Sequence, residues 1–478
     1  MSGLAGGTPI GDLGFRSVQR SCRKRRKSRR LGDGAEWVKP ARSGPRTVSI
    51  ALAGTLAALW LAAPVAAGES AAALRVGTSA DYAPFSHAKN ERAEPEGFDV
   101  ALLRAWTAER KREIVFVRFH WPELVSALAA GRFDVAASGV TVRPDRSAAG
   151  RFTVAVAETE AVALARNPER WGGSATLDRP QIRIAVNGGG YLEQVARASF
   201  PNATLIAVPD NDQVIELLID EQVDAVVTDG AEAPLWEKRV DQPLARIGPL
   251  SRDRKAWLVR ADEPELAADF DAWLLAREAD GTIAALREQW LRGTSGTRTA
   301  EPLRALLGAL DERLALMPLV GVVKRRDGVP LVVPEREKLV LERALADLNA
   351  EAKRTGRTAP RDERVRALFE AQFEAARSVQ LHAVKDSAYH PSEPLPDLEK
   401  ELRPALLRIG ERTARLLLAL PPGLDSAAVH KAAQEELRAP YLDAERRDAL
   451  ADAIAACSAT PAGDASEKPS RPSVGARP

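Results

Sequence analysis

The chain has 478 residues, of which 45% are hydrophobic and 28% charged, a composition typical of a globular protein with two or three packed domains. Its formal net charge of +2 is unevenly distributed, because residues 1–67 hold 12 of the 68 Lys and Arg but only 3 of the 66 Asp and Glu. The rest of the chain keeps 56 basic and 63 acidic side chains, so it is acidic by 7 charges, which argues against a general nucleic-acid binder.

Residues 47–68 read TVSIALAGTLAALWLAAPVAAG, an apolar run that follows a basic flank and ends in small residues. This pattern is typical of a signal peptide, so we predict a leader over residues 1–67, cleavage near Ala67 and export to the periplasm. A single membrane anchor is the alternative, because the run is only slightly short for a membrane span. Pro64 and the small residues after it favour cleavage.

The two cysteines predict no intrachain disulfide in the exported chain. Cys22 lies in the leader, which leaves Cys457 without a partner.

From Leu74 onward, short apolar runs alternate with segments of helical periodicity, in the order LRVGTS, FDVALLRAWTAER, IVFVRF, WPELVSALAAG and FDVAASG. This alternation of strands and helices predicts a parallel α/β sheet. The same rhythm restarts at IRIAVN and ends at VDAVVTD. We therefore predict a two-lobed domain over residues 68–292, with lobe 1 at about 74–165 and 252–292 and lobe 2 at about 166–251.

The carboxyl ends of these strands are the expected place for a ligand, because open α/β sheets bind ligands there. Polar or small residues occupy those ends: Thr78, Tyr82, Ser138, Gly139, Thr141, Asn187, Asp229 and Glu232.

A polar Gly/Thr linker at residues 293–301 separates the lobes from a segment without strand candidates. Residues 302–457 read as helices throughout, which predicts a separate all-α domain. The tail at residues 458–478 is rich in Pro, Ser and Gly and is predicted to be disordered. The histidines and cysteines form no metal-ligand pattern, and no nucleophile turn of the Gly-x-Ser-x-Gly type occurs, so we predict neither a metal nor an organic cofactor.

In the helical segment, Arg313 and Lys324 are eleven residues apart, which is three turns to within about 20°. They therefore share a helix face, and that face is otherwise apolar. A buried unpaired cation is costly, so either an internal carboxylate such as Glu337 neutralises them or the helices hold an anionic ligand. Spacing alone favours the structural explanation.

The positions of Arg313, Lys324, the pair Arg336-Glu337 and Gln380 resemble the active-site pattern of all-helical chorismate mutases. The resemblance covers about residues 302–420, and the sequence DERL before Ala315 resembles the exported class of that family. It implies that the two arginines bind the carboxylates of chorismate. It also implies that Lys324 and Gln380 hydrogen-bond the ether oxygen and that Glu337 binds the ring hydroxyl.

Arg412 resembles the additional arginine with which the exported class completes its site within one chain, although Arg408 and Arg415 compete for this role. Ala376 and Val340 depart from the pattern, since relatives often carry polar side chains there, and we expect these changes to tune affinity. A helical appendage that only mediates dimerisation is a further alternative, and a homodimer remains compatible with the sequence.

The segments LRVGTSADYAPFS, EGFDVALLRAW, GRFDVAASGVTVRPDR and VDAVVTD together resemble the family 3 periplasmic solute-binding proteins, over about residues 74–291. The resemblance implies a two-lobed α/β periplasmic-binding-protein fold, followed here by the all-α chorismate mutase domain. It also implies that Ser138, Thr141 and Arg146 hold the α-carboxylate of a ligand and that Tyr82 covers the ligand.

Other segments look more closely like cyclohexadienyl dehydratases, which are built on the same scaffold: DYAPFS, HWPEL around Trp121, VNGGG, TDGAEA and RKAW around Lys255. This resemblance places Trp121 and Lys255 at the substrate. It implies that Glu232 is the general acid that protonates the departing ring hydroxyl of prephenate or arogenate as CO₂ leaves. Glu232 must then be protonated near neutral pH, which requires desolvation.

Three departures leave two functions open. Gly188 and Tyr191 stand where the dehydratases have a proline and a hydroxyl residue, and Glu160 lies near the position of an expected lysine. The first interpretation is a bifunctional enzyme that converts chorismate to prephenate and prephenate to phenylpyruvate, with arogenate as a further substrate. The alternative is a chorismate mutase fused to a non-catalytic domain that binds an amino acid or an aromatic compound.

Overall fold

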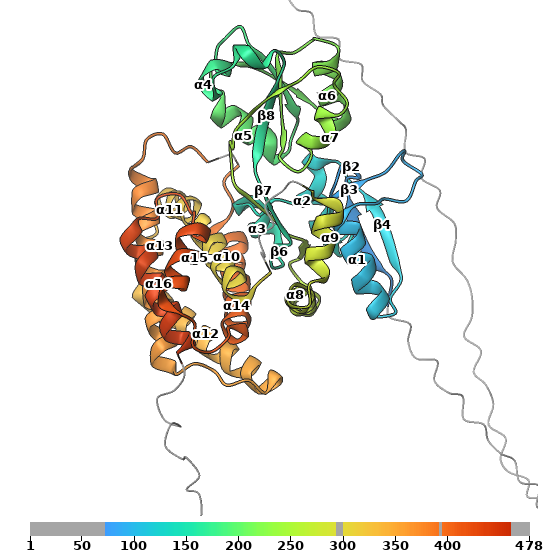
Figure 1. Ribbon diagram of the computed structural model, residues 1–478. Helices are drawn as coiled ribbons and strands as arrows, with labels where there is room; N and C mark the ends of the chain where they lie inside the picture. Colours follow the sequence, from blue (N-terminus) through green and yellow to red (C-terminus); the bar gives the residue numbers. More distant parts are fainter. Residues whose placement is uncertain (1–71, 293–299, 392–393, 460–478) are drawn as a thin grey trace, which may run out of the picture. The chain divides into compact units, whose positions relative to one another are not determined.

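The computed structural model describes residues 72–292, 300–391 and 394–459 (Figure 1). The predicted signal peptide, most of the linker and the tail from residue 460 lie outside the described residues. Within those ranges, no helix combines the length and the apolar character that a membrane span requires.

The first lobe is a five-stranded sheet flanked by helices. It consists of β1 (Leu74–Thr78), the short strands β2 (Asp81–Tyr82) and β3 (Ser86–His87), α1 (Phe98–Glu109), β4 (Ile114–Arg118), α2 (Leu124–Ala129), β5 (Val135–Ala136), α3 (Pro144–Ala149), β6 (Gly150–Phe152), β14 (Leu258–Arg260), α8 (Pro264–Ala279) and α9 (Thr282–Trp290). The strand order is β4-β1-β5-β14-β6. β1 is parallel to β4 and β5, while the returning strand β14 is antiparallel to β5 and β6.

The second lobe repeats this architecture. It consists of β8 (Ala161–Ala165), α4 (Ser174–Leu177), β9 (Arg183–Asn187), α5 (Tyr191–Ser199), β10 (Thr204–Val208), α6 (Asn211–Ile219), β11 (Ala225–Asp229), α7 (Ala233–Glu237) and β12 (Ala245–Ile247). The strand order is β10-β9-β11-β8-β12. Every residue of β8 and β11 is buried, as a sheet covered on both faces requires.

β8 corrects the lobe boundary expected near residue 165. It pairs with β11 and β12 of the second sheet, so the chain leaves the first lobe before Ala161. Two short antiparallel strands, β7 (Ala157–Thr159) and β13 (Asp253–Lys255), make the two crossings between the lobes. Because successive side chains of a strand point to opposite faces, neighbouring residues of β13 contact different parts of the molecule.

The helical domain follows the lobes and contains no strand among its described residues. It consists of α10 (Pro302–Ala315), α11 (Met317–Arg326), α12 (Pro334–Thr355), α13 (Asp362–Lys385), the π-helical turn η3 (Leu398–Leu402), α14 (Arg403–Ala419), α15 (Ser426–Glu436) and α16 (Ala444–Ser458). The helical periodicity from Pro302 through Lys324 predicted a single helix, but the structure has two helices there, because the first ends at Ala315 and Leu316 interrupts it. Pro318 follows this break and has no N–H to donate within a helix.

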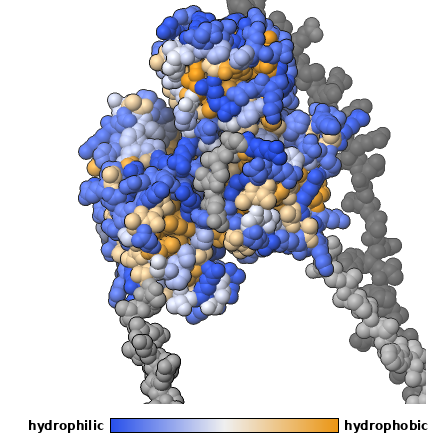
Figure 2. Space-filling model, viewed as in Figure 1, coloured by the Kyte–Doolittle hydropathy of each residue, from blue (hydrophilic) through white to orange (hydrophobic). Residues whose placement is uncertain are grey.

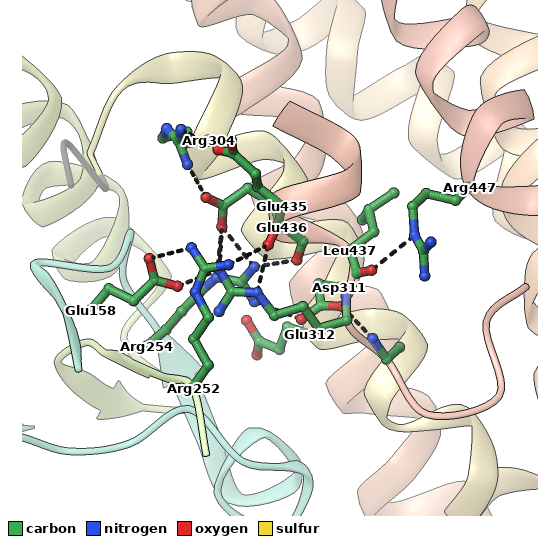
Figure 3. Close-up of polar contacts among 12 residues, drawn as sticks. Glu158, Arg252, Arg254, Arg304, Asp311, Glu312, Glu435, Glu436, Leu437 and Arg447 are labelled. Atoms are coloured by element: carbon green, nitrogen blue, oxygen red, sulfur yellow. Dashed lines mark hydrogen bonds and ion pairs between the residues drawn. The ribbon is translucent and has the colours of Figure 1, made fainter. Parts of the chain in front are cut away.

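Apolar side chains of lobe 1, among them Phe270 and Trp273, belong to the same buried cluster as Ala305 and Leu306 of α10. Polar contacts join the two parts at β13, where Arg254 pairs with Asp311 (Figure 3). On the face drawn in Figure 2, hydrophilic residues predominate and apolar residues gather in separate patches.

Candidate active sites

The helical domain encloses a cavity of about 100 Å³ whose wall is formed by α10, α11, α12, α13, η3 and α14. Five residues singled out from the sequence line this one cavity: Arg313, Lys324, Arg336, Glu337 and Gln380. Apolar side chains such as Val320, Phe373 and Leu407 complete the wall. The cavity is therefore largely apolar, with charged and amide groups gathered in it.

Arg313 and Lys324 each donate a hydrogen bond to a backbone carbonyl. Arg313 Nη1 donates to the Leu406 carbonyl at 3.3 Å, and Lys324 Nζ donates to the Leu331 carbonyl at 2.8 Å. Neither forms an ion pair with any carboxylate in the described part of the chain. Burial lowers the pKa of Arg313 to about 10, and burial together with the nearby Arg403 charge lowers the pKa of Lys324. Both groups would gain from an anion in the cavity.

Glu337 is not their counter-ion. Its carboxylate pairs with Arg377 through two contacts, one of them between Nε and Oε1 at 3.0 Å. The structural explanation for Arg313 and Lys324, an internal carboxylate partner, is therefore not realised at Glu337.

At the cavity wall, Gln380 and Arg336 each have side-chain polar atoms without a hydrogen-bond partner among the described residues. Gln380 is 5% exposed, and its Nε2 donates to the Ala376 carbonyl at 3.2 Å while Oε1 is buried without a partner among the described residues. The half-buried guanidinium of Arg336 likewise has no hydrogen bond or ion pair with a described residue. Buried polar groups with unmet capacity commonly mark a place for a ligand or water.

Arg412, expected at this cavity, lies elsewhere. Its guanidinium pairs with Glu312 and donates to the carbonyl oxygens of Phe152 and Thr153 in lobe 1. The cavity is bordered instead by Arg403, the first residue of α14, which sequence reasoning missed.

The two other arginines considered for that role also face lobe 1. Arg408 donates to the carbonyls of residues 147, 148 and 150, and Arg415 lies 3.4 Å from Asp271. At 100° per residue, positions 408, 412 and 415 all lie at least about 120° around the helix from Arg403, which accounts for the difference. The sequence did offer one signal for Arg403. It shares a helix face with the apolar residues Leu406 and Leu407, which also line the cavity.

A second cavity, of about 30 Å³, lies in the cleft between the lobes. Seven of the predicted residues line it: Tyr82, Trp121, Gly139, Thr141, Arg146, Asn187 and Lys255. Gly139 has φ +62°, and a Cβ there would lie 2.7 Å from the Tyr82 ring, so both its backbone and its surroundings require glycine. Asn211 and Tyr191 also line the cleft and were not predicted as ligand contacts.

Arg146 is the cleft's unpaired cation. It is 3% exposed, its Nη1 donates to the Thr141 carbonyl at 3.0 Å, and its guanidinium stacks over the Trp121 ring at 5.7 Å. No carboxylate of the described residues pairs with it, and burial lowers its pKa to about 9. A carboxylate of a ligand would satisfy this group.

Lys255 is also fully buried, but it has a partner. Its Nζ lies 2.9 Å from Asp229 Oδ2 and donates to Thr141 Oγ1 at 2.9 Å. Asp229 is 0% exposed and also accepts from Thr159 Oγ1 at 2.9 Å. Asp229 therefore lies behind the cleft wall, where it holds Lys255.

Ser138 likewise lies behind the wall. It is 0% exposed, and its hydroxyl is hydrogen-bonded to Ser79.

Glu232 is buried behind Asn211 at the start of α7. Its Oε1 accepts from Asn211 Nδ2 at 2.8 Å, and its Oε2 is 2.6 Å from Thr228 Oγ1. Burial raises the pKa of this carboxyl well above its usual range, and the neighbouring Asp229 and Asp81 raise it further. Its surroundings therefore favour the protonated form over a wider pH range than for a free carboxyl. Asn211 Nδ2 also donates to the Asp81 carbonyl at 3.2 Å, which links the lobes across the cleft.

The chain thus consists of a two-lobed α/β domain with a cavity in its cleft and an all-helical domain with a cavity of its own. Residues 74–293 match the family model for bacterial extracellular solute-binding proteins, family 3, and residues 304–381 match the model for chorismate mutase type II. The chain belongs to the solute-binding family 3 through its first domain, and its helical domain matches the chorismate mutase type II model.

Among curated proteins, the cyclohexadienyl dehydratase of Pseudomonas aeruginosa is 30% identical over 223 residues, which cover 46% of this chain and 82% of that protein. The ABC transporter arginine-binding protein 1 of Escherichia coli is 26% identical and covers 47% of this chain and 93% of its own length. Among solved structures, an ancestral amino acid-binding protein described as a precursor of cyclohexadienyl dehydratase is 29% identical, with a TM-score of 0.43, over 46% of this chain and 96% of that one.

Proposed function

We propose that the protein is a bifunctional enzyme that converts chorismate to prephenate in the helical cavity and prephenate to phenylpyruvate in the cleft between the lobes. The observation that carries this proposal is the convergence of Arg313, Lys324, Arg336 and Gln380 on one largely apolar cavity, with no carboxylate partner for the three cations among the described residues.

In the helical cavity, arginines hold the two carboxylates of chorismate and thereby keep the substrate in its folded, reactive conformation. The reaction breaks the ether C–O bond and forms a C–C bond within the same molecule. Negative charge grows on the ether oxygen as that bond lengthens. Lys324 and Gln380, which line the cavity, donate hydrogen bonds to this oxygen in the proposed mechanism, and a preorganised donor is worth more in the transition state than in the ground state. The step requires no nucleophile.

In the cleft, Arg146 holds a carboxylate of prephenate and Trp121 and Tyr82 enclose the ring. Glu232, whose pKa burial raises well above its usual range, serves as the general acid for the ring hydroxyl, which it reaches when Asn211 turns aside. The C–O bond to that hydroxyl breaks, water leaves, the ring carboxylate departs as CO₂ and its bonding electrons complete the aromatic ring. Asn211, which lines the cleft and donates to Glu232 behind it, is the added contact that the sequence did not indicate.

Two features support the pairing of these activities in one exported chain. The product of the first site is the substrate of the second, and fusion raises the local concentration of that intermediate. The first domain belongs to a family of extracellular proteins, which supports a periplasmic location after removal of residues 1–67.

The test is to follow chorismate loss and phenylpyruvate formation by ultraviolet absorbance on the purified chain. Disappearance of chorismate with appearance of phenylpyruvate supports both activities. A protein that makes prephenate but leaves added prephenate untouched would reduce the proposal to a mutase fused to a binding domain. A chain that leaves chorismate unchanged would remove the mutase assignment.

A further inference from the structure

We propose that the buried Lys255–Asp229 ion pair makes the cleft select 2-oxo acids over the corresponding α-amino acids, so that prephenate and phenylpyruvate are accepted and arogenate and phenylalanine are rejected. This inference rests on the proposed function of the cleft and names its substrate class. Prephenate and arogenate differ in one group, a 2-oxo carbonyl against an α-ammonium.

The first support is the charge of the cleft wall. Among the residues that line the cavity, Arg146 and Lys255 are charged and none is Asp or Glu. The remaining polar groups are hydroxyls and amides, from Tyr82, Thr141, Asn187, Tyr191 and Asn211. A carboxylate entering this cleft meets the unpaired Arg146, whereas an ammonium group meets that like charge and no free counter-charge, because Asp229 is already paired with Lys255.

The second support is that Asp229, the carboxylate nearest to Lys255, is already fully engaged. Its Oδ2 is 2.9 Å from Lys255 Nζ and 2.9 Å from Thr159 Oγ1, and its Oδ1 accepts from the Ala231 amide at 2.9 Å. At 0% exposure it presents no oxygen to a ligand. An ammonium group that reached for Asp229 would have to displace Lys255.

The other nearby acids, Asp81, Glu232 and Asp253, do not line the cavity. Glu232 accepts from Asn211 and Thr228, and one oxygen of Asp253 accepts from Ser251 Oγ at 2.9 Å. A buried ammonium without a partner is strongly disfavoured. A 2-oxo group, in contrast, is an acceptor and can take a hydrogen bond from the hydroxyl of Thr141, which lines the cavity.

The experiment compares phenylpyruvate with L-phenylalanine by calorimetry on the full chain, because these ligands differ only in the group at issue. We expect phenylpyruvate to bind at least ~10²-fold more tightly, the scale at which a site rejects a group that it leaves unpaired. Arg146→Leu should abolish the heat of phenylpyruvate binding, which assigns that heat to the cleft rather than to the helical cavity. Equal affinity for the two ligands, or binding of neither at millimolar concentration, would overturn the proposal.

Variants of the ion pair sharpen the test. Lys255→Met frees Asp229 for an ammonium and should shift the preference toward phenylalanine at least ~10-fold relative to wild type. Lys255→Met/Asp229→Asn removes both charges, leaves no buried carboxylate unpaired, and should show an intermediate preference. Lys238→Met, on the exposed end of α7, is the control and should keep the wild-type preference. An unchanged preference in both ion-pair variants would contradict the role of the pair.

Measuring the turnover of prephenate and arogenate distinguishes a failure of this inference from a failure of the proposed function. If the chain dehydrates prephenate and arogenate with similar kcat/KM, the function stands and the selectivity is refuted. If it binds phenylpyruvate selectively but dehydrates neither compound, the selectivity stands and the dehydratase assignment is refuted.

Discussion

Arg403 and Arg412 lie on opposite faces of helix α14, so that Arg403 borders the helical cavity while Arg412 pairs with Glu312 and with backbone carbonyls of lobe 1. Nine residues separate them, which is two and a half turns. Arg403 is held on the cavity side by an ion pair with Glu399. The two arginines therefore offer a matched pair for testing which face serves the substrate.

We predict that Arg403→Gln lowers the kcat/KM of the mutase about 10²-fold, because a cation at the ligand is lost. Arg412→Gln should leave mutase kcat/KM within about threefold but destabilise the chain by about 3–5 kcal/mol, since Glu312 is left buried and unpaired. Chorismate absorbance and chemical denaturation measure the two effects. Equal losses of mutase activity in both variants would contradict the assignment.

Lys324→Ala should lower the kcat/KM of the mutase by at least ~10²-fold, because the proposed mechanism assigns to this cavity-lining residue the hydrogen bond to the developing charge on the ether oxygen. Lys338→Ala is the control, since Lys338 lies on α12 with a side chain that is 77% exposed. It should retain wild-type turnover. Near-normal activity of Lys324→Ala would remove this residue from the site.

Glu232→Gln should lower the rate of prephenate dehydration by about 10²–10⁴-fold, because the amide cannot transfer a proton to the leaving hydroxyl. Phenylpyruvate binding should persist, since Arg146 is untouched. Stopped assays for phenylpyruvate and calorimetry measure the two properties. Full dehydratase activity in this variant would show that another group is the acid.

The free energy of unfolding should depend on pH through Glu232, and this contribution should fall as pH rises. Its folded-state pKa is raised by burial, so the folded chain binds this proton more tightly than the unfolded chain does. The contribution of the protonated carboxyl is therefore fully present below the unfolded value of about 4.3 and is lost as pH rises toward the folded pKa.

Melting curves over a pH series check this relation. The Tm of wild type should fall relative to that of Glu232→Gln as pH rises, because the variant has no carboxyl to ionise. Asp99 and Asp253, whose pKa values burial raises to about 6, are present in both proteins and cancel in the difference. Parallel curves would contradict the raised pKa.

Arg254 should be needed for the stability of the contact between the lobes and the helical domain. Its guanidinium pairs with Asp311 at 2.6 Å and with Glu436 at 2.8 Å, and it is flanked by Arg304 and Glu158 (Figure 3). Removing it leaves two buried carboxylates less well compensated, so Arg254→Gln should cost about 3 kcal/mol in unfolding free energy.

Arg246→Gln is the matched control for Arg254. It breaks a half-exposed pair with Glu237 in lobe 2 and should cost less than about 1 kcal/mol. Denaturation of both variants, followed by tryptophan fluorescence, compares them. A cost for Arg254→Gln no larger than that of the control would show that the pairs contribute little.

Local periodicity was enough to predict the fold class. The apolar runs that became β1, β9 and β11 are continuous because both faces of their sheets are buried, and the helical pattern after residue 302 contains no strand signal. The two-lobed α/β fold and the following helical domain were thus predicted correctly. The extent of lobe 1 was not, because β8 follows β7 after a single residue and nothing in TVAVAETEAVALA indicates a change of sheet.

Helical spacing also identified Arg313 and Lys324 as candidates, and the family resemblance added Gln380; all three line one cavity. Spacing along one helix fixes which residues share a face, but it does not say which neighbour that face meets. Tertiary packing alone turned Arg403 toward the cavity and Arg412 toward lobe 1, because the orientation of α14 depends on contacts from residues far away in the sequence. The pairing of Lys255 with Asp229, like that of Glu337 with Arg377, likewise depends on strands and helices that meet only in the folded chain.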